Sequence, residues 1–207
     1  MDPRRQRTVD ALLRAAEEAF AERAVDDVTV EEIAERAGVA VGSLYNHFGS
    51  KAGLHAAVVE RAVDVDRNYM DRAYTADRTP RERINAAAEE YLRFYLDHPE
   101  YFRMLAFPGD PGRYPAGREL SDRMAEAIAA QNSRLVDELR RGVEAGLLRP
   151  VDPEAVATVL WAAWNGVISL GWRPDGLRRD EERLRELLMI AVDVIANGLL
   201  ASGHEDP

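Results

Sequence analysis

The chain lacks cysteine altogether, and this absence excludes several kinds of site. Without thiols there is no disulfide framework, no thiolate zinc site and no cysteine nucleophile. The sequence also has no run of eighteen or more apolar residues, the usual mark of a membrane-spanning helix. The first twenty residues turn amphipathic within ten residues, unlike a secretion signal. We therefore expect a cytoplasmic protein that has no membrane partner.

Acidic residues are missing from one stretch, although the whole chain carries a net charge of −10. Residues 36–59 contain no Asp or Glu, whereas the acid frequency of the chain predicts about four there. The stretch does contain Arg36, His47, Lys51 and His55. A surface without acids suits a polyanion, because phosphate binding needs local positive potential. Chance in a short apolar stretch is the alternative explanation.

Helical periodicity runs through the whole chain, and no segment shows the alternation typical of a strand. Thr29-Val30-Glu31-Glu32 is a capping box, in which the Thr side chain caps the helix and the Glu reaches back. Thr79-Pro80-Arg81-Glu82 is a second helix start, with Pro at the first helical position. Residues 108–117 are rich in Pro and Gly and predict a loop. The expected fold class is all-α.

Residues 29–51, TVEEIAERAGVAVGSLYNHFGSK, carry the pattern that says most about function. A short helix ending at Gly38, a turn and a second helix over Val41–Phe48 match helix-turn-helix geometry. In the second helix, Leu44 and Phe48 face inward. The outer face is small at its N-terminal end, which lets the backbone approach the major groove, and its short polar side chains suit phosphates and base edges.

This stretch resembles the DNA-binding domain of the TetR family of transcriptional repressors, most clearly in Ser43–Phe48 and the Gly49-Ser50-Lys51 that follows. The likeness covers residues 8–60. Two departures stand out: Ala24 and Val25 replace a usual glycine and aromatic residue, and Val41 is apolar where relatives are often polar or basic. The resemblance implies operator contacts from the matching residues: Thr29, Ala40, Val41, Gly42, Ser43, Tyr45, Asn46, His47 and Lys51.

One of these assignments, that of Lys51, has a further argument from the residue itself, and the assignments of Tyr45 and His47 have an alternative. Lys51 is the only lysine beside twenty-six arginines, and it lies at a helix N-terminus where a compact ammonium suits a phosphate. Without the resemblance, Tyr45 and His47 are ordinary surface residues of a helical bundle. The segment Arg4–Arg7 is either a solvated tail or an arm that reaches phosphates or the minor groove.

The resemblance also implies an N-terminal three-helix helix-turn-helix domain, residues 1–52, and a helical ligand-sensing and dimerisation domain, residues 53–207. Helices over 153–170 and 180–200 are too apolar for solvent faces and would pair in a homodimer. We expect a small hydrophobic effector with one or two polar groups. Its candidate ligand residues are Tyr91, Tyr95, Phe102, Trp161, Trp164 and Asn165. The aromatic residues fit a core equally well, and Asn165 also fits a contact across the dimer.

We therefore predict a ligand-responsive repressor that binds palindromic operator DNA as a dimer, with half-sites one turn apart. A DNA-binding protein without a ligand and a transcriptional activator are the alternatives. An enzyme is disfavoured because the chain has no Gly-rich phosphate loop, scattered histidines and no recognisable acid pair. A helical interaction module would leave the helix-turn-helix pattern unexplained. No cofactor and no metal are expected.

Overall fold

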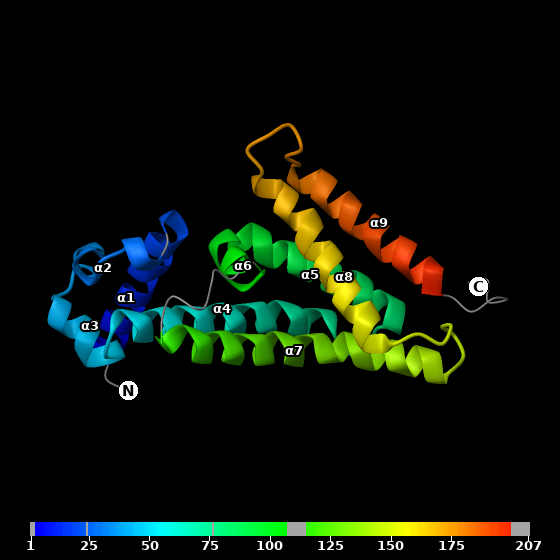
Figure 1. Cartoon of the computed structure of the whole chain (residues 1–207), viewed down its shortest axis with the longest axis horizontal. Coiled ribbons are helices and arrows are strands. Elements are labelled where there is room, and N and C mark those ends of the chain that lie inside the picture. The colour runs from blue at the N-terminus through cyan, green and yellow to red at the C-terminus, as the bar shows by residue number, and fades with distance from the viewer. Residues whose placement is uncertain (1–2, 24, 76, 107–114, 200–207) are drawn as a thin grey trace. The chain divides into compact units, whose positions relative to one another are not determined.

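The structure, a computed structural model, describes residues 3–23, 25–75, 77–106 and 115–199, with side chains from residue 122 onward in the last range (Figure 1). Every regular element in this described part is helical, so the predicted all-α class is confirmed. The elements are α1 (Pro3–Glu22), η1 (Val25–Asp27), α2 (Val30–Ala37), α3 (Val41–Phe48), α4 (Lys51–Ala73), α5 (Pro80–Asp97), α6 (Pro99–Ala106), α7 (Pro115–Glu144), α8 (Pro153–Ser169), η3 (Leu170–Trp172) and α9 (Glu181–Leu199).

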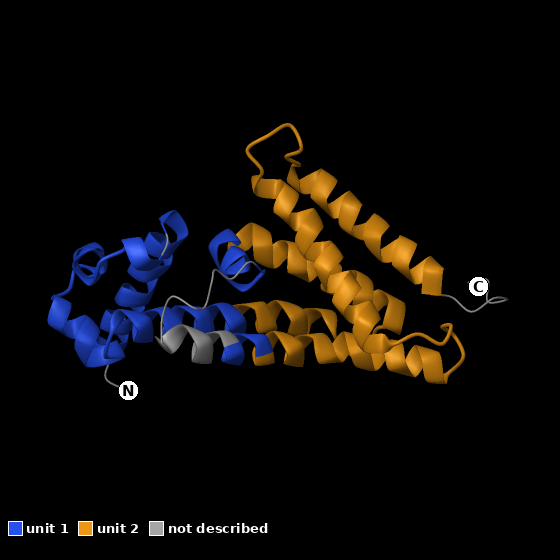
Figure 2. Cartoon of the chain, in the orientation of Figure 1, with its two compact units in different colours: residues 1–64, 99–125 blue, residues 65–98, 126–207 orange. Residues whose placement is uncertain are grey.

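Two compact units divide the chain, and each combines segments that are far apart in the sequence (Figure 2). Unit 1 comprises residues 1–64 and 99–125, and unit 2 comprises residues 65–98 and 126–207. Helices α4 and α7 therefore contribute to both units. These units differ from the predicted division at residues 52 and 53, because α6 packs against α1 in unit 1.

The helix-turn-helix lies in unit 1, where α1 packs against both α2 and α3. Thr29 caps α2 through its side-chain oxygen, which accepts the Glu32 N–H at 3.2 Å. Gly38 ends α2 in the left-handed conformation, φ +68°, which glycine adopts without a steric penalty. Leu44 is fully buried, as an inward-facing residue of the second helix should be. The bounds of α3 are those predicted from the sequence.

A close approach fixes the end of α3 against the start of α4. The Ser50 side-chain oxygen accepts the Gly53 N–H at 3.0 Å and so caps α4. A Cβ atom added to Gly53 would lie 2.0 Å from the Phe48 carbonyl oxygen. Because that oxygen belongs to the backbone, it cannot move aside cheaply. Only glycine fits this junction.

Unit 2 is built around contacts of α9 with α5 and α8. The predicted helix start at Thr79 is confirmed, with Pro80 in the first turn of α5, and Thr79 and Glu82 form a complete reciprocal capping box. Asp152 caps α8 through its carboxylate alone, which accepts the Glu154 N–H at 3.0 Å. The fully buried side chains of this unit's core are mainly aliphatic and aromatic: Leu92, Phe94, Ile168, Leu184 and Leu188.

Two predictions at helix ends are wrong. A solvated tail at Arg4–Arg7 is wrong, because these residues form the first turns of α1, and their contact with phosphates or the minor groove stays a prediction. The loop predicted over residues 108–117 ends earlier than expected, because α7 already begins at Pro115. Proline is compatible with the first turn of a helix, where its missing N–H has no partner to lose. Residues 108–114 and 200 lie outside the described part.

The junction at Gly53 gives a first prediction. We expect Gly53→Ala to lower the free energy of unfolding by about 1–3 kcal/mol, because the added methyl group collides with a backbone oxygen. Urea denaturation of the full chain measures this loss. Gly198→Ala is the matched control, since a Cβ there meets no atom within 4 Å. If both variants unfold at the same urea concentration, the junction tolerates a side chain and this account of it is wrong.

Candidate DNA interface and effector site

The outer face of α3 presents small and polar groups to solvent. Tyr45 is 50% exposed, and Gly42 and Asn46 are also exposed. Val41, Ser43 and His47 are half-buried, and Ala40 and Thr29, just before α3 and α2, are exposed. A side chain at Gly42 would meet no other atom within 4 Å, so the surface is open at that point.

Arg36, one of the basic residues in the acid-free stretch, is held within unit 1. Its guanidinium donates to both carboxylate oxygens of Glu22, at 3.0 and 3.1 Å, and to Glu32 at 3.4 Å. Arg23 also pairs with Glu32 and donates to the Asp27 carbonyl at 3.3 Å. Hydrogen bonding to Arg36 lowers the pKa of Glu22, so this exposed network is ionised at neutral pH. The positive charge of Arg36 is thereby neutralised by carboxylates of the same unit.

Lys51 has a structural role that the sequence did not predict. Its Nζ donates to the carbonyl oxygens of Val25 and Val28, both at 2.9 Å, and of Asp26 at 3.4 Å. These oxygens belong to η1 and the link into α2, so the ammonium joins the start of α4 to the link before the helix-turn-helix. An ammonium has three N–H donors, and all three have acceptors here. A phosphate contact would have to displace at least one of them.

His55 also contributes little positive charge to the stretch. Its ring packs edge-on against Phe20, with 5.3 Å between ring centroids, and burial lowers the pKa of the imidazole. His55 is therefore neutral at pH 7. Arg4, Arg5 and Arg7, on the first turns of α1, are among the exposed arginines of unit 1.

Four of the six predicted ligand residues come together in unit 2. The Tyr91 hydroxyl donates to Asn165 Oδ1 at 2.8 Å, and Trp161 is hydrogen-bonded to the same hydroxyl. The Trp164 ring lies 6.1 Å from the Tyr91 ring between centroids. Burial raises the pKa of Tyr91, which keeps the hydroxyl protonated. The structure thus joins α5 and α8 through an aromatic and amide cluster.

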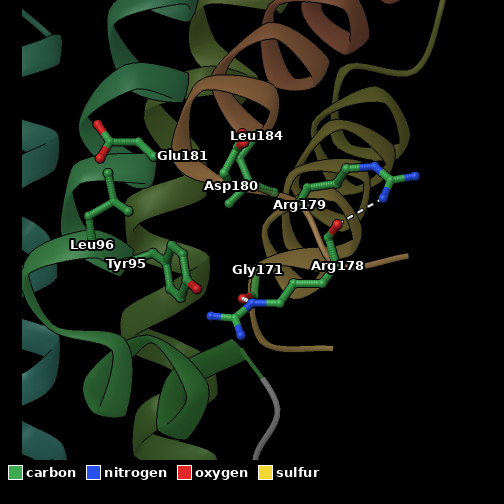
Figure 3. A pocket seen from close by; sticks show the side chains of 8 residues that line it. All are labelled: Tyr95, Leu96, Gly171, Arg178, Arg179, Asp180, Glu181 and Leu184. Atoms are coloured by element: carbon green, nitrogen blue, oxygen red, sulfur yellow. Dashed lines mark hydrogen bonds between the residues drawn. The ribbon is translucent and has the colours of Figure 1, made fainter. Parts of the chain in front are cut away.

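The other two predicted ligand residues lie elsewhere. Phe102 is fully buried on α6 and belongs to unit 1. Tyr95 lines a cavity of about 520 Å³ in unit 2 (Figure 3). Its ring also packs against Trp172. Two arginines border this cavity, and Arg178 Nε donates to the Gly171 carbonyl at 3.2 Å. The complete lining is Tyr95, Leu96, Gly171, Arg178, Arg179, Asp180, Glu181 and Leu184.

Asp66 and Gln131 are buried polar residues near the Tyr91 cluster that sequence reasoning missed. Gln131 Nε2 donates to Asp66 Oδ2 at 2.5 Å, joining α7 to α4. The Asp66 charge raises the pKa of Tyr91, so Asp66 lies within electrostatic reach of the cluster. A sequence signal was available: Asp66 falls on the apolar stripe of α4 that contains Ala62 and Tyr69, where a charge is out of place.

Asp66 reduces the stability of the folded chain at neutral pH. The residue is only 7% exposed, and burial raises its pKa from 3.8 to about 7. The folded state therefore binds a proton more tightly than the unfolded state, and stability falls as the pH rises from about 4 to about 7. Above that window the whole cost of the buried charge is present. A group this unfavourable to folding is a candidate for function.

Two further features concern metals and membranes. Among the described residues, no group of three or more His, Asp or Glu side chains is placed to hold a metal ion. One described segment, Pro153–Trp172, is long and apolar enough to cross a membrane, and 33% of it is buried. Core helices of soluble proteins pass the same test, so this is weak support for a membrane span.

Family comparisons match both ends of the chain. Residues 12–58 match the family described as "Bacterial regulatory proteins, tetR family", and residues 84–195 match "Tetracyclin repressor-like, C-terminal domain". The second match alone covers more than half of the chain. The first includes the whole helix-turn-helix, and the second includes the Tyr91 cluster.

Individual relatives agree with these matches. The HTH-type transcriptional activator FasR of Mycolicibacterium smegmatis is 32% identical over 70% of this chain and 66% of its own length, just under two thirds. RutR of Escherichia coli K12, a transcriptional regulator, is 29% identical over 74% of this chain and 70% of its own. The solved SmeT–triclosan complex shares the fold, with TM-score 0.73, 24% identity and coverage of 97% and 95%. The chain therefore belongs to the TetR family of helix-turn-helix transcriptional regulators.

Proposed function

We propose that this regulator is a repressor that binds palindromic operator DNA as a homodimer and leaves it when a small, largely apolar effector binds. The observation that carries the proposal is the open, uncharged outer face of α3 on a capped helix-turn-helix. We assign the chain a regulatory and not a catalytic role, in the cytoplasm.

We propose that α3 contacts base edges and α1 and α2 contact phosphates. Gly42 and the small residues beside it allow the backbone of α3 to enter the major groove. Asn46 and Tyr45 extend polar groups from the same exposed side, the amide being suited to an adenine edge. Thr29 lies at the N-terminus of α2, where helix N–H groups attract phosphate. The wider DNA-contact set remains Thr29, Ala40, Val41, Gly42, Ser43, Tyr45, Asn46 and His47.

For Lys51 we propose a positioning role in place of the phosphate contact expected from the family resemblance. Its three donors hold η1 and the start of α2 against α4. We propose that the phosphate contacts come instead from arginines on the first turns of α1, among them Arg5 and Arg7.

We propose that α8 and α9 form the dimer interface. Val159 on α8 is 60% exposed, and Val194 and Ile190 on α9 are 65% and 51% exposed. The two helices pack on each other, so these residues mark apolar surface on adjoining elements. Exposed apolar surface of this kind is typical of a protein–protein contact. A twofold dimer would present two copies of α3 to two half-sites.

An effector in unit 2 can reach the DNA-binding helices through α4, which is one continuous helix shared by both units. In unit 1, α6 also contacts α1, and the Tyr101 hydroxyl is hydrogen-bonded to Glu17. Packed helices shift rather than compress, so a ligand that enters unit 2 must displace its neighbours. A coupling of about 1–3 kcal/mol would weaken operator binding roughly 5- to 150-fold.

Activation of transcription is the second candidate, because the relative FasR is named an activator. A third candidate is DNA binding without any effector. The SmeT structure was solved with triclosan, an apolar molecule with a polar group. This supports a regulator that responds to an effector over one that binds DNA without an effector. A promoter reporter that carries the selected operator separates repression from activation by the sign of the change when the regulator is deleted.

The effector mechanism predicts that the effector and operator DNA weaken each other's binding by the same factor. Genomic selection would first identify the operator, and thermal shift against a chemically diverse library would identify a stabilising compound. We expect the affinity of that compound, measured by calorimetry, to fall on addition of operator by the same factor by which the compound weakens operator binding. Equal affinities with and without operator would show that the compound is not an inducer.

The open face of α3 predicts that a small side chain at Gly42 raises the stability of the fold and weakens DNA binding. We expect Gly42→Ala to stabilise the fold by up to about 1 kcal/mol, because alanine favours a helix and the space is empty. The methyl group should hold the backbone away from the groove and weaken operator binding roughly tenfold. Gly198→Ala should be stabilised without this loss. Unchanged operator affinity in Gly42→Ala would remove this part of α3 from the groove.

The hydrogen bonds of Lys51 predict a loss of stability in Lys51→Ala. We expect a lower melting temperature and weaker binding to all DNA sequences alike, because the link before α2 loses its anchor. The slope of the logarithm of the DNA-association constant against the logarithm of the salt concentration should change by less than one unit, since no phosphate contact is lost. A slope smaller by about one, with an unchanged melting temperature, would restore Lys51 to the phosphate contacts.

The dimer proposal predicts that a charge on the apolar faces of α8 and α9 separates the subunits. Val159→Asp and Val194→Asp should each cost several kcal/mol of association free energy, because the carboxylate would be buried without a partner. Both side chains are exposed in the single chain, so the fold should persist. Sedimentation velocity measures the mass. Leu177→Asp, at an exposed apolar residue outside both helices, is the control, and dimeric Val159→Asp and Val194→Asp variants would refute the interface.

A further inference from the structure

Three carboxylates are buried among the described residues of unit 2, and they differ in their partners. Glu138 is paired with Arg83 and Arg141. Glu90 is likewise paired with two arginines, Arg93 at 2.9 Å and Arg72 at 3.5 Å. The hydrogen bond of Asp66 comes from a neutral amide, that of Gln131, and Arg67 also acts on Asp66 through its charge. Asp66 therefore stands apart as a buried carboxylate held by a neutral side chain.

The Asp66–Gln131 pair leaves two hydrogen-bond acceptors unused. Asp66 Oδ1 and Gln131 Oε1 are both buried, and neither has a hydrogen-bond donor among the residues that the structure describes. Each such acceptor costs free energy in a folded interior, and a carboxylate oxygen costs more than an amide oxygen. Both atoms accept and neither can donate when Asp66 is ionised. The chemistry that satisfies them is a group with two or more N–H or O–H donors.

Aromatic side chains of unit 2 lie within electrostatic reach of Asp66. Tyr91 feels the charge of Asp66, and its ring is close to Trp164. The Tyr91 hydroxyl already donates to Asn165 and therefore does not serve the unused acceptors. Aromatic faces attract organic cations, most strongly where water is excluded. A carboxylate next to aromatic rings selects a cation over a neutral donor.

We propose that Asp66 and Gln131 bind the protonated amine of an otherwise apolar effector, with Tyr91 and Trp164 packed against its carbon skeleton. The inference rests on the effector-responsive function proposed above and names the chemical class of the effector. A primary ammonium has three N–H donors, enough for both unused oxygens. Its charge balances the carboxylate, and this removes the cost that burial imposes on ionised Asp66.

The test compares matched phenyl compounds that differ in one polar group. 2-Phenylethylamine is a cation with N–H donors, 2-phenylethanol is neutral, and benzyltrimethylammonium is a cation without N–H. Calorimetry and tryptophan fluorescence at about pH 8, where most Asp66 is ionised, measure their affinities for the full chain. We expect the amine to bind at least roughly tenfold more tightly than either other compound, the difference of one charge-assisted hydrogen bond or more.

Asp66→Asn should abolish this preference, because the amide keeps the shape of the side chain and loses the charge. The variant should melt at a higher temperature than the wild type at the same pH, which excludes loss of folding as the cause. Glu138→Gln is the matched control, a buried carboxylate with arginine partners, and should keep the preference. A preference for the amine that survives in Asp66→Asn, or equal wild-type affinities for amine and alcohol, would overturn the inference.

Operator binding distinguishes failure of this inference from failure of the proposed function. If neutral compounds release the operator and the amine shows no Asp66-dependent preference, effector regulation stands and the amine site is wrong. If the amine binds with the expected Asp66 dependence and leaves operator affinity unchanged, the site stands and its regulatory role is wrong.

Discussion

The contact between the last turn of α3 and the first turn of α4 is the constraint on which the DNA-binding face depends. A helix of eight residues is not stable alone in water, so the direction of α3 is set by its packing. Gly53 lets α4 approach the Phe48 carbonyl, and Lys51 ties the same turn to the link before α2. The end of α3, the start of α4 and the link before α2 therefore hold one another at one point.

Local features of unit 1 were predictable because their signals lie within a few residues. The Thr29 cap, the end of α2 at Gly38 and the bounds of α3 all follow from caps, glycine and helical spacing. The partners of Arg36 and Lys51 were not predictable in this way. Glu22 lies fourteen residues from Arg36, and Val25 lies twenty-six from Lys51, so only the packed chain brings them together. The sequence singles out Lys51 as the only lysine, but its carbonyl partners are brought to it only by folding.

The effector region was only partly predictable for a related reason. Aromatic residues and Asn165 stood out in an apolar sequence, and four of them meet. Sequence spacing could not separate Tyr95 from that group, although it lies one turn of α5 beyond Tyr91 and borders a cavity that the group does not line. Asp66 and Gln131 come from helices whose polar residues are mostly solvated. Their burial depends on which faces α4 and α7 turn inward.

The internal pairing of basic side chains has a consequence for the search for a binding site along a chromosome. Arg36 and Lys51 are occupied by carboxylates and carbonyls, His55 is neutral, and the chain as a whole is acidic. Sequence-independent affinity for DNA comes mainly from displacing counterions with free cations. We therefore expect the helix-turn-helix itself to add little sequence-independent affinity, so that discrimination between sites would depend on the proposed contacts of α3 with base edges.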